Sequence, residues 1–235
     1  MQNKFFEGKD FNNKFKALIP KYYPLEYKNY VEEEKKLIIN KVKGSNKILE
    51  AGVGIGRIIP FIAPKVKLFV GIDNANLMLE ESKQISKKYK NVEIKKIDIE
   101  KLDKNYLKDY FDYSLCIWNT LGNVKDEVKV LTQLSKVTSK EIIITVYKKG
   151  TIEKRINWYN TVGIEIKKIN KKDEIFYTKS GLKSKSYNLD DIKKIAKQAN
   201  LKIKTHKILS NVILYIELSK EWTWQLNVIN VKSQL

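Results

Sequence analysis

A glycine-rich segment at residues 48–57, ILEAGVGIGR, carries the most specific chemical signal in the chain. Glu50 stands two places before three glycines that alternate with other residues: Gly52, Gly54 and Gly56. Glycines at this spacing let the backbone turn tightly and let a ligand approach the main chain closely. The segment departs from the G-x-G-x-x-G pattern of dinucleotide sites, because Arg57 or Ile59 stands at the third glycine position. It therefore predicts a ligand-binding loop of another kind.

Two further acidic residues stand where predicted strands end. Asp73 ends the apolar run LFVGID, and Asp98 directly follows the run VEIKKI. A carboxylate at the tip of the second strand can accept hydrogen bonds from both hydroxyls of a ribose. Asp98 can accept a hydrogen bond from the amino group of an adenine, and Ile99 offers an apolar contact and a backbone N–H beside it. Together these residues predict a nucleoside site.

The segment FDYSLCIWNTLGNV, residues 111–124, brings an aromatic residue and two polar residues to the end of another predicted strand. In open α/β sheets, ligands bind outside the carboxyl ends of the strands. We therefore expect Trp118, Asn119 and Thr120 to border both a cofactor and a substrate. The alternative for Trp118, weighted equally, is an aromatic residue of the core.

Alternating strand and helix patterns must position these residues. Short apolar runs predict strands at residues 47–51, 68–73, 92–97, 113–118 and 141–147. Helical spacing of apolar residues predicts helices over residues 31–42, 75–89 and 124–138. This order is typical of βαβ units, and the continuous apolar strands favour a parallel sheet that is covered by helices on both faces.

The last third of the chain has a different pattern. It predicts a helix over residues 151–163, a small antiparallel ribbon, a helix that begins at Asn188 and a closing pair of strands. We interpret the chain as one domain, because no linker or repeat interrupts it. Its expected parts are a helical lid (1–43), a cofactor-binding core (44–150), a helix and ribbon insertion (151–187) and a closing helix with strands (188–235).

The acid followed by three alternating glycines resembles motif I of the class I S-adenosylmethionine (SAM) dependent methyltransferases. Asp73, the segment NANLML after it, and the acid–hydrophobe pair at Asp98 are similar to the family's motifs at the same places. Residues 111–124 resemble a segment of the small-molecule, glycine N-methyltransferase-like members. The N-P-P-Y motif of many adenine and amide-nitrogen methyltransferases is missing, and Val137–Lys140 replace the family's frequent Pro-Gly-Gly turn.

The resemblance covers residues 45–147 and implies an α/β, Rossmann-like fold with a mostly parallel seven-stranded sheet. It implies SAM as the methyl donor and S-adenosylhomocysteine as the product. The glycine loop would pass under the methionyl part of SAM, Glu50 would face its amino group, and Asn74 would lie beside the adenosine.

Methyl transfer from a sulfonium mainly requires alignment of the acceptor and exclusion of water, although an amine or hydroxyl acceptor can need a base. Our candidates for catalytic roles are Tyr22, Tyr147 and Asn119. The tyrosines, including Tyr23 and Tyr27, have an equally weighted alternative, which is to pack the first helix onto the core. With one histidine, one cysteine and no clustered carboxylates, the sequence predicts no metal site.

The net charge of +19 invites a nucleic-acid interpretation, but 44 of the 46 basic residues are lysine. Lysine, isoleucine and asparagine have AT-rich codons, so a biased genome explains the charge without a polyanionic partner. We expect a cytoplasmic protein, since the N-terminus lacks a secretory signal and no apolar run spans a membrane.

Three functions stay open. We favour a SAM-dependent methyltransferase that acts on a small-molecule nitrogen or oxygen. The basic surface keeps a methyltransferase of RNA or protein as the alternative. The third possibility is a SAM-binding protein without transferase activity, in which the Trp222-Thr223-Trp224 tail would serve an interface. The sequence does not indicate an oligomeric state.

Overall fold

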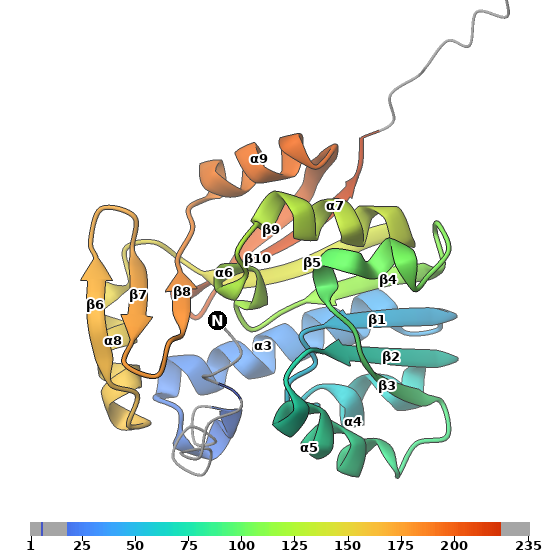
Figure 1. Cartoon of the computed structure of the whole chain (residues 1–235), viewed down its shortest axis with the longest axis horizontal. Helices are drawn as coiled ribbons and strands as arrows, with labels where there is room; N and C mark the ends of the chain where they lie inside the picture. Colours follow the sequence, from blue (N-terminus) through green and yellow to red (C-terminus); the bar gives the residue numbers. More distant parts are fainter. Residues whose placement is uncertain (1–5, 7–17, 222–235) are drawn as a thin grey trace, which may run out of the picture.

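A seven-stranded sheet forms the centre of the computed structural model, which describes residue 6 and residues 18–221 (Figure 1). The strands lie in the order β3-β2-β1-β4-β5-β10-β9, and β10 alone runs antiparallel to its two neighbours. Their bounds are β1 Lys47–Ala51, β2 Leu68–Asp73, β3 Val92–Lys96, β4 Phe111–Cys116, β5 Thr138–Tyr147, β9 Leu201–Leu209 and β10 Ile213–Lys220. The predicted mostly parallel, seven-stranded sheet is confirmed.

Helices cover both faces of this sheet, as the apolar strands predict. Alternate residues of one strand enter different hydrophobic clusters, with Ile48 in the cluster beneath α3 and Leu49 in the cluster beneath α7. The helices are α3 Leu25–Val42, α4 Ile59–Ile62, α5 Asn76–Ser86, α6 Thr120–Asn123, α7 Glu127–Val137, α8 Ile152–Thr161 and α9 Leu189–Gln198. Short 3-10 turns are η2 Pro20–Tyr22, η3 Ala63–Lys65 and η4 Ile99–Lys104. None of the described helices is long and apolar enough to cross a bilayer.

The helix that follows the glycine loop is much shorter than a typical βαβ helix. It ends after the four residues of α4, and the chain continues in the 3-10 turn η3. Pro64 lies in this turn, where it lacks an N–H and its ring crowds the carbonyl four residues earlier. By contrast, α9 begins at Asn188 as predicted, with a reciprocal capping box between Asn188 and Asp191.

The predicted ribbon is a separate antiparallel sheet in the order β6-β7-β8. Its strands are β6 Ile166–Asn170, β7 Ile175–Thr178 and β8 Lys183–Lys185. Figure 1 shows it beyond the end of the main sheet, beside α8 and α6. Of the predicted lid, η2 and α3 are described, whereas residues 1–5 and 7–17 and the Trp222-Thr223-Trp224 tail lie outside the described residues.

Candidate cofactor and substrate site

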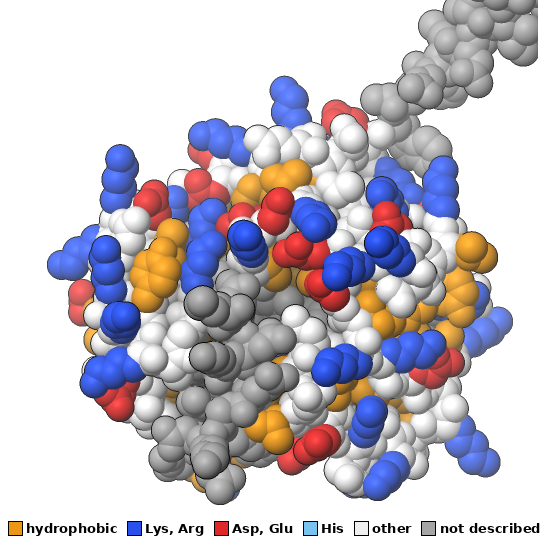
Figure 2. All heavy atoms as spheres, in the orientation of Figure 1, with side chains coloured by type: hydrophobic (Ala, Val, Ile, Leu, Met, Phe, Trp, Pro, Cys, Tyr) orange, Lys and Arg blue, Asp and Glu red, His pale blue; other side chains and the backbone are white. Residues whose placement is uncertain are grey.

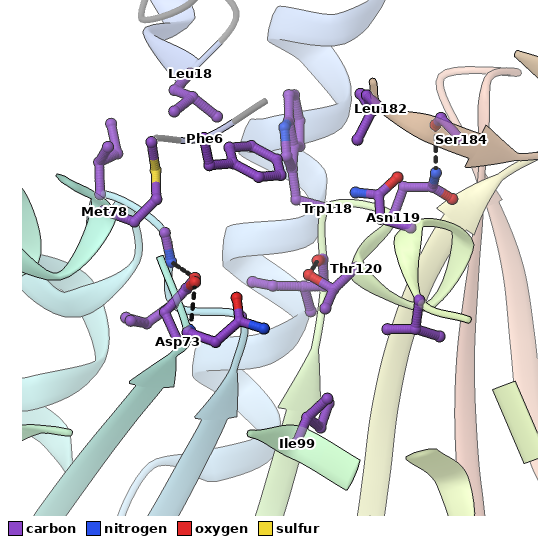
Figure 3. A pocket seen from close by; sticks show the side chains of 18 of the residues that line it. Phe6, Leu18, Asp73, Met78, Ile99, Trp118, Asn119, Thr120, Leu182 and Ser184 are labelled. Carbon is purple, nitrogen blue, oxygen red and sulfur yellow. Dashed lines mark hydrogen bonds between the residues drawn. The ribbon is translucent and has the colours of Figure 1, made fainter. Parts of the chain in front are cut away.

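A cavity of about 240 Å³ lies at the carboxyl ends of β1, β2 and β4 (Figure 3). It brings together eleven of the residues that the sequence predicted for the site: Glu50, Gly52, Gly54, Asp73, Asn74, Asp98, Ile99, Trp118, Asn119, Thr120 and Tyr147. Two predicted site residues, Gly56 and Tyr22, are not part of its lining.

Tyr22 lies at the end of η2 with 37% of its surface exposed, and its ring contacts the Lys21 ammonium. Its neighbour Tyr23 is buried instead and lines the cavity. Consecutive side chains of such a turn point to different sides, so the turn places only the second tyrosine of the pair at the site. Our catalytic interpretation of Tyr22 therefore has no support in the geometry.

The glycine loop is folded tightly against β2 and is open toward the cavity at one position. The N–H groups of Gly52 and Val53 both donate to the Ile72 carbonyl, at 2.9 Å. Gly52 has φ +78°, and a Cβ there would lie 2.6 Å from the Thr120 side chain. At Gly54, with φ +53°, a Cβ would meet nothing within 4 Å. Gly52 thus permits the turn, and Gly54 leaves room for a ligand beside the main chain.

Asp73 is held at the edge of the cavity by three backbone donors. Its Oδ1 accepts from the N–H groups of Asn74 and Ala75, at 2.8 and 3.0 Å, and its Oδ2 accepts from Gly54 at 3.0 Å. Burial raises the pKa of the Asp73 carboxyl, and the three donors partly offset this effect. The carboxylate is therefore fixed in place, and its Oδ2 keeps a free lone pair for a hydroxyl donor.

Asp98 lies at the start of η4, one residue after Ile97, whose N–H donates to the Asp73 carbonyl at 3.1 Å. Its Oδ1 accepts from the Glu100 N–H at 3.0 Å and caps the turn, while Ile99 follows it into the lining. Lys101 lies 3.8 Å from the other carboxylate oxygen. This geometry places an acid and an apolar side chain next to each other in the cavity lining, and their contact with an adenine stays a prediction.

Glu50 is the most perturbed acid of the cavity. It is buried, and no described residue donates a hydrogen bond to its Oε2. Burial raises the pKa of this carboxyl from its ordinary value of 4.5 to about 8, partly opposed by the nearby Arg57 guanidinium. A buried carboxylate with a free oxygen fits a cationic group of a ligand, such as an amino group.

Glu34 of α3, which no sequence motif indicates, connects the first helix to the site. Its Oε1 accepts from the hydroxyls of Tyr30 and Thr145, at 2.5 and 2.6 Å, and its Oε2 accepts from Arg57 at 2.5 Å. The Thr145 hydroxyl oxygen in turn accepts from the Trp118 N–H at 2.8 Å. This network fixes Arg57 in the cavity wall and joins α3 to the ends of β4 and β5.

Aromatic side chains form the end of the cavity away from Asp73. Tyr23 stacks on Trp118 with ring centroids 5.0 Å apart, and Tyr147 and Trp158 lie 5.8 Å apart. Tyr27 is fully buried and stacks behind them on Trp158, so it belongs to the core. The hydroxyl of Tyr23 and the indole N–H of Trp158 are buried without a partner among the described residues. We refer to this aromatic end of the cavity as the aromatic chamber, lined by Tyr23, Trp118, Asn119, Tyr147, Trp158, Tyr159, Ile164, Leu182 and Ser184.

Asn119 has a positioning role that the sequence did not reveal. Its backbone is left-handed, with φ +58°, and its Oδ1 accepts from the Tyr147 N–H at 3.1 Å. Its Nδ2 donates to the Ser184 hydroxyl at 3.0 Å (Figure 3). The amide thereby ties the end of β4 to β5 and to β8, and one N–H of Nδ2 remains for a ligand.

Tyr147 lines the chamber, but its electrostatics oppose the role of general base. Burial raises the pKa of its phenol well above the ordinary value, and the positive charge of Arg155 opposes this only partly. The phenol is therefore protonated at neutral pH and can only donate or accept a hydrogen bond there. The expectation that this tyrosine removes a proton from the acceptor is not supported.

The cavity residues that were not predicted from the sequence include Arg57, Trp158, Tyr159 and Ser184. Amino-acid composition could have indicated Arg57, because the chain has 44 lysines and only two arginines, Arg57 and Arg155. The other residues lie far from the motifs along the chain, and only the tertiary fold brings them to the site.

Known methyltransferases share this fold. A structure of a SAM-dependent methyltransferase from Clostridium acetobutylicum ATCC 824 is 16% identical, with a TM-score of 0.61, over 80% of this chain and 91% of that one. Magnesium protoporphyrin IX methyltransferase from Synechocystis PCC 6803, with S-adenosylhomocysteine bound, is 14% identical, with a TM-score of 0.65, over 92% and 96%. A Burkholderia thailandensis 1,6-didemethyltoxoflavin-N1-methyltransferase is 12% identical, with a TM-score of 0.61, over 80% and 76%.

These low identities establish a common fold. No match was found among curated protein sequences. A family model, by contrast, matches residues 43–227, and its description is "Methyltransferase domain". Because this match spans most of the chain, the protein belongs to this family of methyltransferases, as the resemblance to class I SAM-dependent members predicted.

Proposed function

We propose that the protein transfers the methyl group of SAM to a nitrogen or oxygen atom of a small molecule. The observation that carries this proposal is the continuity of the cavity from the glycine loop into the aromatic chamber. A chamber with aromatic walls suits a small, largely apolar molecule. The structure of the Burkholderia thailandensis 1,6-didemethyltoxoflavin-N1-methyltransferase is described with 1,6-didemethyltoxoflavin bound, which supports a small-molecule substrate here.

The distribution of lysine favours a small substrate over a polyanion. Lys125 is the one lysine that lines the cavity among the described residues. Figure 2 shows the other lysines of the visible face spread over its surface, with acidic side chains between them. A nucleic-acid footprint would instead gather basic residues around the mouth of the site.

The acidic end of the cavity fits SAM. Glu50 would accept from the amino group of the methionyl part, Asp73 from the ribose hydroxyls and Asp98 from the adenine amino group. When bound, SAM supplies a methyl group that is already activated by its sulfonium.

The protein's own contribution is mainly orientation and exclusion of water. α3 and the ribbon bury the aromatic chamber, and Asn119 fixes its walls by accepting a hydrogen bond from the Tyr147 N–H and donating one to the Ser184 hydroxyl. Holding an acceptor in line can lower the barrier by up to roughly 7–11 kcal/mol in ideal cases. Because Tyr147 stays protonated, we expect an acceptor that is already nucleophilic at neutral pH.

Methylation of a metabolite extract with isotope-labelled SAM tests this function. We expect mass spectrometry to detect a labelled small molecule with the wild-type protein and much less with Asp73→Ala. Isothermal titration calorimetry with SAM and S-adenosylhomocysteine provides the binding control. Label that enters only RNA or protein would refute the small-molecule proposal, and failure of both ligands to bind at about millimolar concentration would refute the cofactor.

A further inference from the structure

Arg155 of α8 carries a buried positive charge behind the aromatic chamber. Its side chain is fully buried, and no carboxylate of the described residues lies within 4.0 Å of it. Its hydrogen bonds go to neutral acceptors instead, which are the hydroxyls of Ser186, Tyr159 and Ser184 and the Ser184 carbonyl. Arg57, the other arginine, is paired with Glu34. The guanidinium also lies over the rings of Tyr147 and Phe176, 4.2 and 4.0 Å from their centroids, and these contacts offset part of the cost of its burial. A negative group nearby would offset the rest.

The hydrogen bonds of Arg155 determine what Ser184 offers to the chamber. The Ser184 hydroxyl oxygen accepts from Arg155 Nη2 at 2.9 Å and from Asn119 Nδ2 at 3.0 Å. A hydroxyl has two lone pairs and one hydrogen, so both lone pairs are in use. The hydrogen remains, and Ser184 lines the cavity (Figure 3). Ser184 can therefore act toward a ligand only as a donor.

Tyr159 and Trp158 have the same donor character. The Tyr159 hydroxyl accepts from Arg155 Nη2 at 3.0 Å and keeps its own hydrogen for another acceptor. The Trp158 indole N–H can only donate, and it is buried without a partner among the described residues. Both side chains line the cavity. The chamber thus presents several hydrogen-bond donors with a guanidinium behind them.

Acidic side chains are confined to the other end of the cavity. Those among its described lining residues are Glu50, Asp73, Asp98 and Glu100. The cavity is therefore polarised, with carboxylates where a cationic cofactor fits and with donors and a buried positive charge in the chamber. Such an environment favours an anion on the apolar substrate and disfavours an ammonium group.

We propose that the chamber binds a small aromatic carboxylic acid, with the carboxylate held by the hydroxyls of Ser184 and Tyr159 and its charge balanced by Arg155. The proposal rests on the proposed function, because it names the substrate class of the same cavity. The alternative is a purely structural Arg155 that joins α8 to β8, which would give the site no preference for an anion.

Calorimetric titration of the protein saturated with S-adenosylhomocysteine distinguishes these roles. The probes are 3-hydroxybenzoate, 3-hydroxybenzamide and 3-hydroxybenzylamine, which share a ring and differ in charge. We expect the carboxylate to bind at least about tenfold tighter than the amide, and the amine to bind weakest. In Ser184→Ala the preference for the carboxylate should fall to about twofold or less.

Ser186→Ala is the matched control, because it removes another hydroxyl bonded to Arg155 that does not line the cavity. We expect this variant to keep the wild-type preference, and both variants to bind S-adenosylhomocysteine normally, which verifies their folding. Equal binding of carboxylate and amide, or no binding of any probe at about 10 mM, would overturn the proposal. Failure of the wild-type protein to bind S-adenosylhomocysteine would instead overturn the proposed function.

Discussion

Replacing Glu50 with glutamine should stabilise the free protein and weaken its binding of SAM. The pKa of this carboxyl rises from 4.5 to about 8 on burial, so folding at pH 7 requires it to take up a proton. The pH lies about 2.5 units above the ordinary pKa, and each unit corresponds to about 1.4 kcal/mol. Glu50→Gln removes this cost and is expected to raise the free energy of unfolding at pH 7 by up to about 3 kcal/mol.

The pH dependence of this gain has a definite sign. Below pH 4.5 the carboxyl is protonated in both the folded and the unfolded chain, so it contributes no cost. Between pH 4.5 and about 8 the unfolded chain loses its proton while the folded chain keeps it, and the cost grows as the pH rises. The difference in stability between Glu50→Gln and the wild type should therefore be large at pH 7 and close to zero near pH 4.5.

Urea denaturation of both proteins at the two pH values measures this difference, and Glu80→Gln on the exposed side of α5 serves as a matched control. We expect the control to shift stability by less than about 0.5 kcal/mol. Calorimetry should show SAM binding weakened about tenfold or more in Glu50→Gln. The amino group of SAM would favour the ionised form of Glu50 on binding, and glutamine cannot form that charge-assisted hydrogen bond. A variant that is less stable at pH 7, or a gain that does not depend on pH, would refute the reasoning.

Further perturbations address the remaining parts of the site. Asp73→Ala should weaken SAM binding by about 1–3 kcal/mol in calorimetry, because the ribose hydroxyls lose their acceptor, and unchanged affinity would exclude that role. Glu34→Ala should lower the free energy of unfolding in urea by about 2–4 kcal/mol, since the largely buried Arg57 would lose its carboxylate, whereas a loss below about 1 kcal/mol would contradict this account. Gly52→Ala should cost about 1–3 kcal/mol in the same assay because of its positive φ, and a neutral effect would contradict it. Tyr147→Phe should leave the shape of the pH–rate profile unchanged between about pH 6 and 9, and loss of a limb would identify the phenol as a base.

The sheet and the acidic end of the site could be predicted because their signals are local. Each strand is a short apolar run, and Glu50, Asp73 and Asp98 lie within two residues of a strand end, so the topology of the sheet alone brings them together. Such local signals could not predict that Tyr23 lines the cavity and that Tyr22 is exposed. This difference depends on the backbone of a three-residue turn, and the sequence pattern describes both tyrosines equally well.

The aromatic chamber could not be predicted because its contacts join distant parts of the chain. Glu34 bonds to Thr145, 111 residues away, and Asn119 bonds to Ser184, 65 residues away. The residue types alone do not predict these hydrogen bonds, since a glutamate on a helix of a lysine-rich chain is typical of an exposed surface. Only the packing of α3 and the ribbon over the strand ends makes these side chains buried neighbours.

The two arginines show how composition can still locate a site. At an exposed position lysine can replace arginine, because only a solvated positive charge is needed there. Lysine cannot replace arginine where one side chain must donate to several acceptors in one plane, because an ammonium group lacks the planar geometry of a guanidinium. Arg155 donates from two nitrogens to Ser186, Ser184 and Tyr159, and Arg57 binds Glu34 from the cavity wall. In a chain with 44 lysines, the two arginines lie in or directly behind the cavity wall. The positions of the rare arginines therefore indicate the site, whereas the many lysines do not.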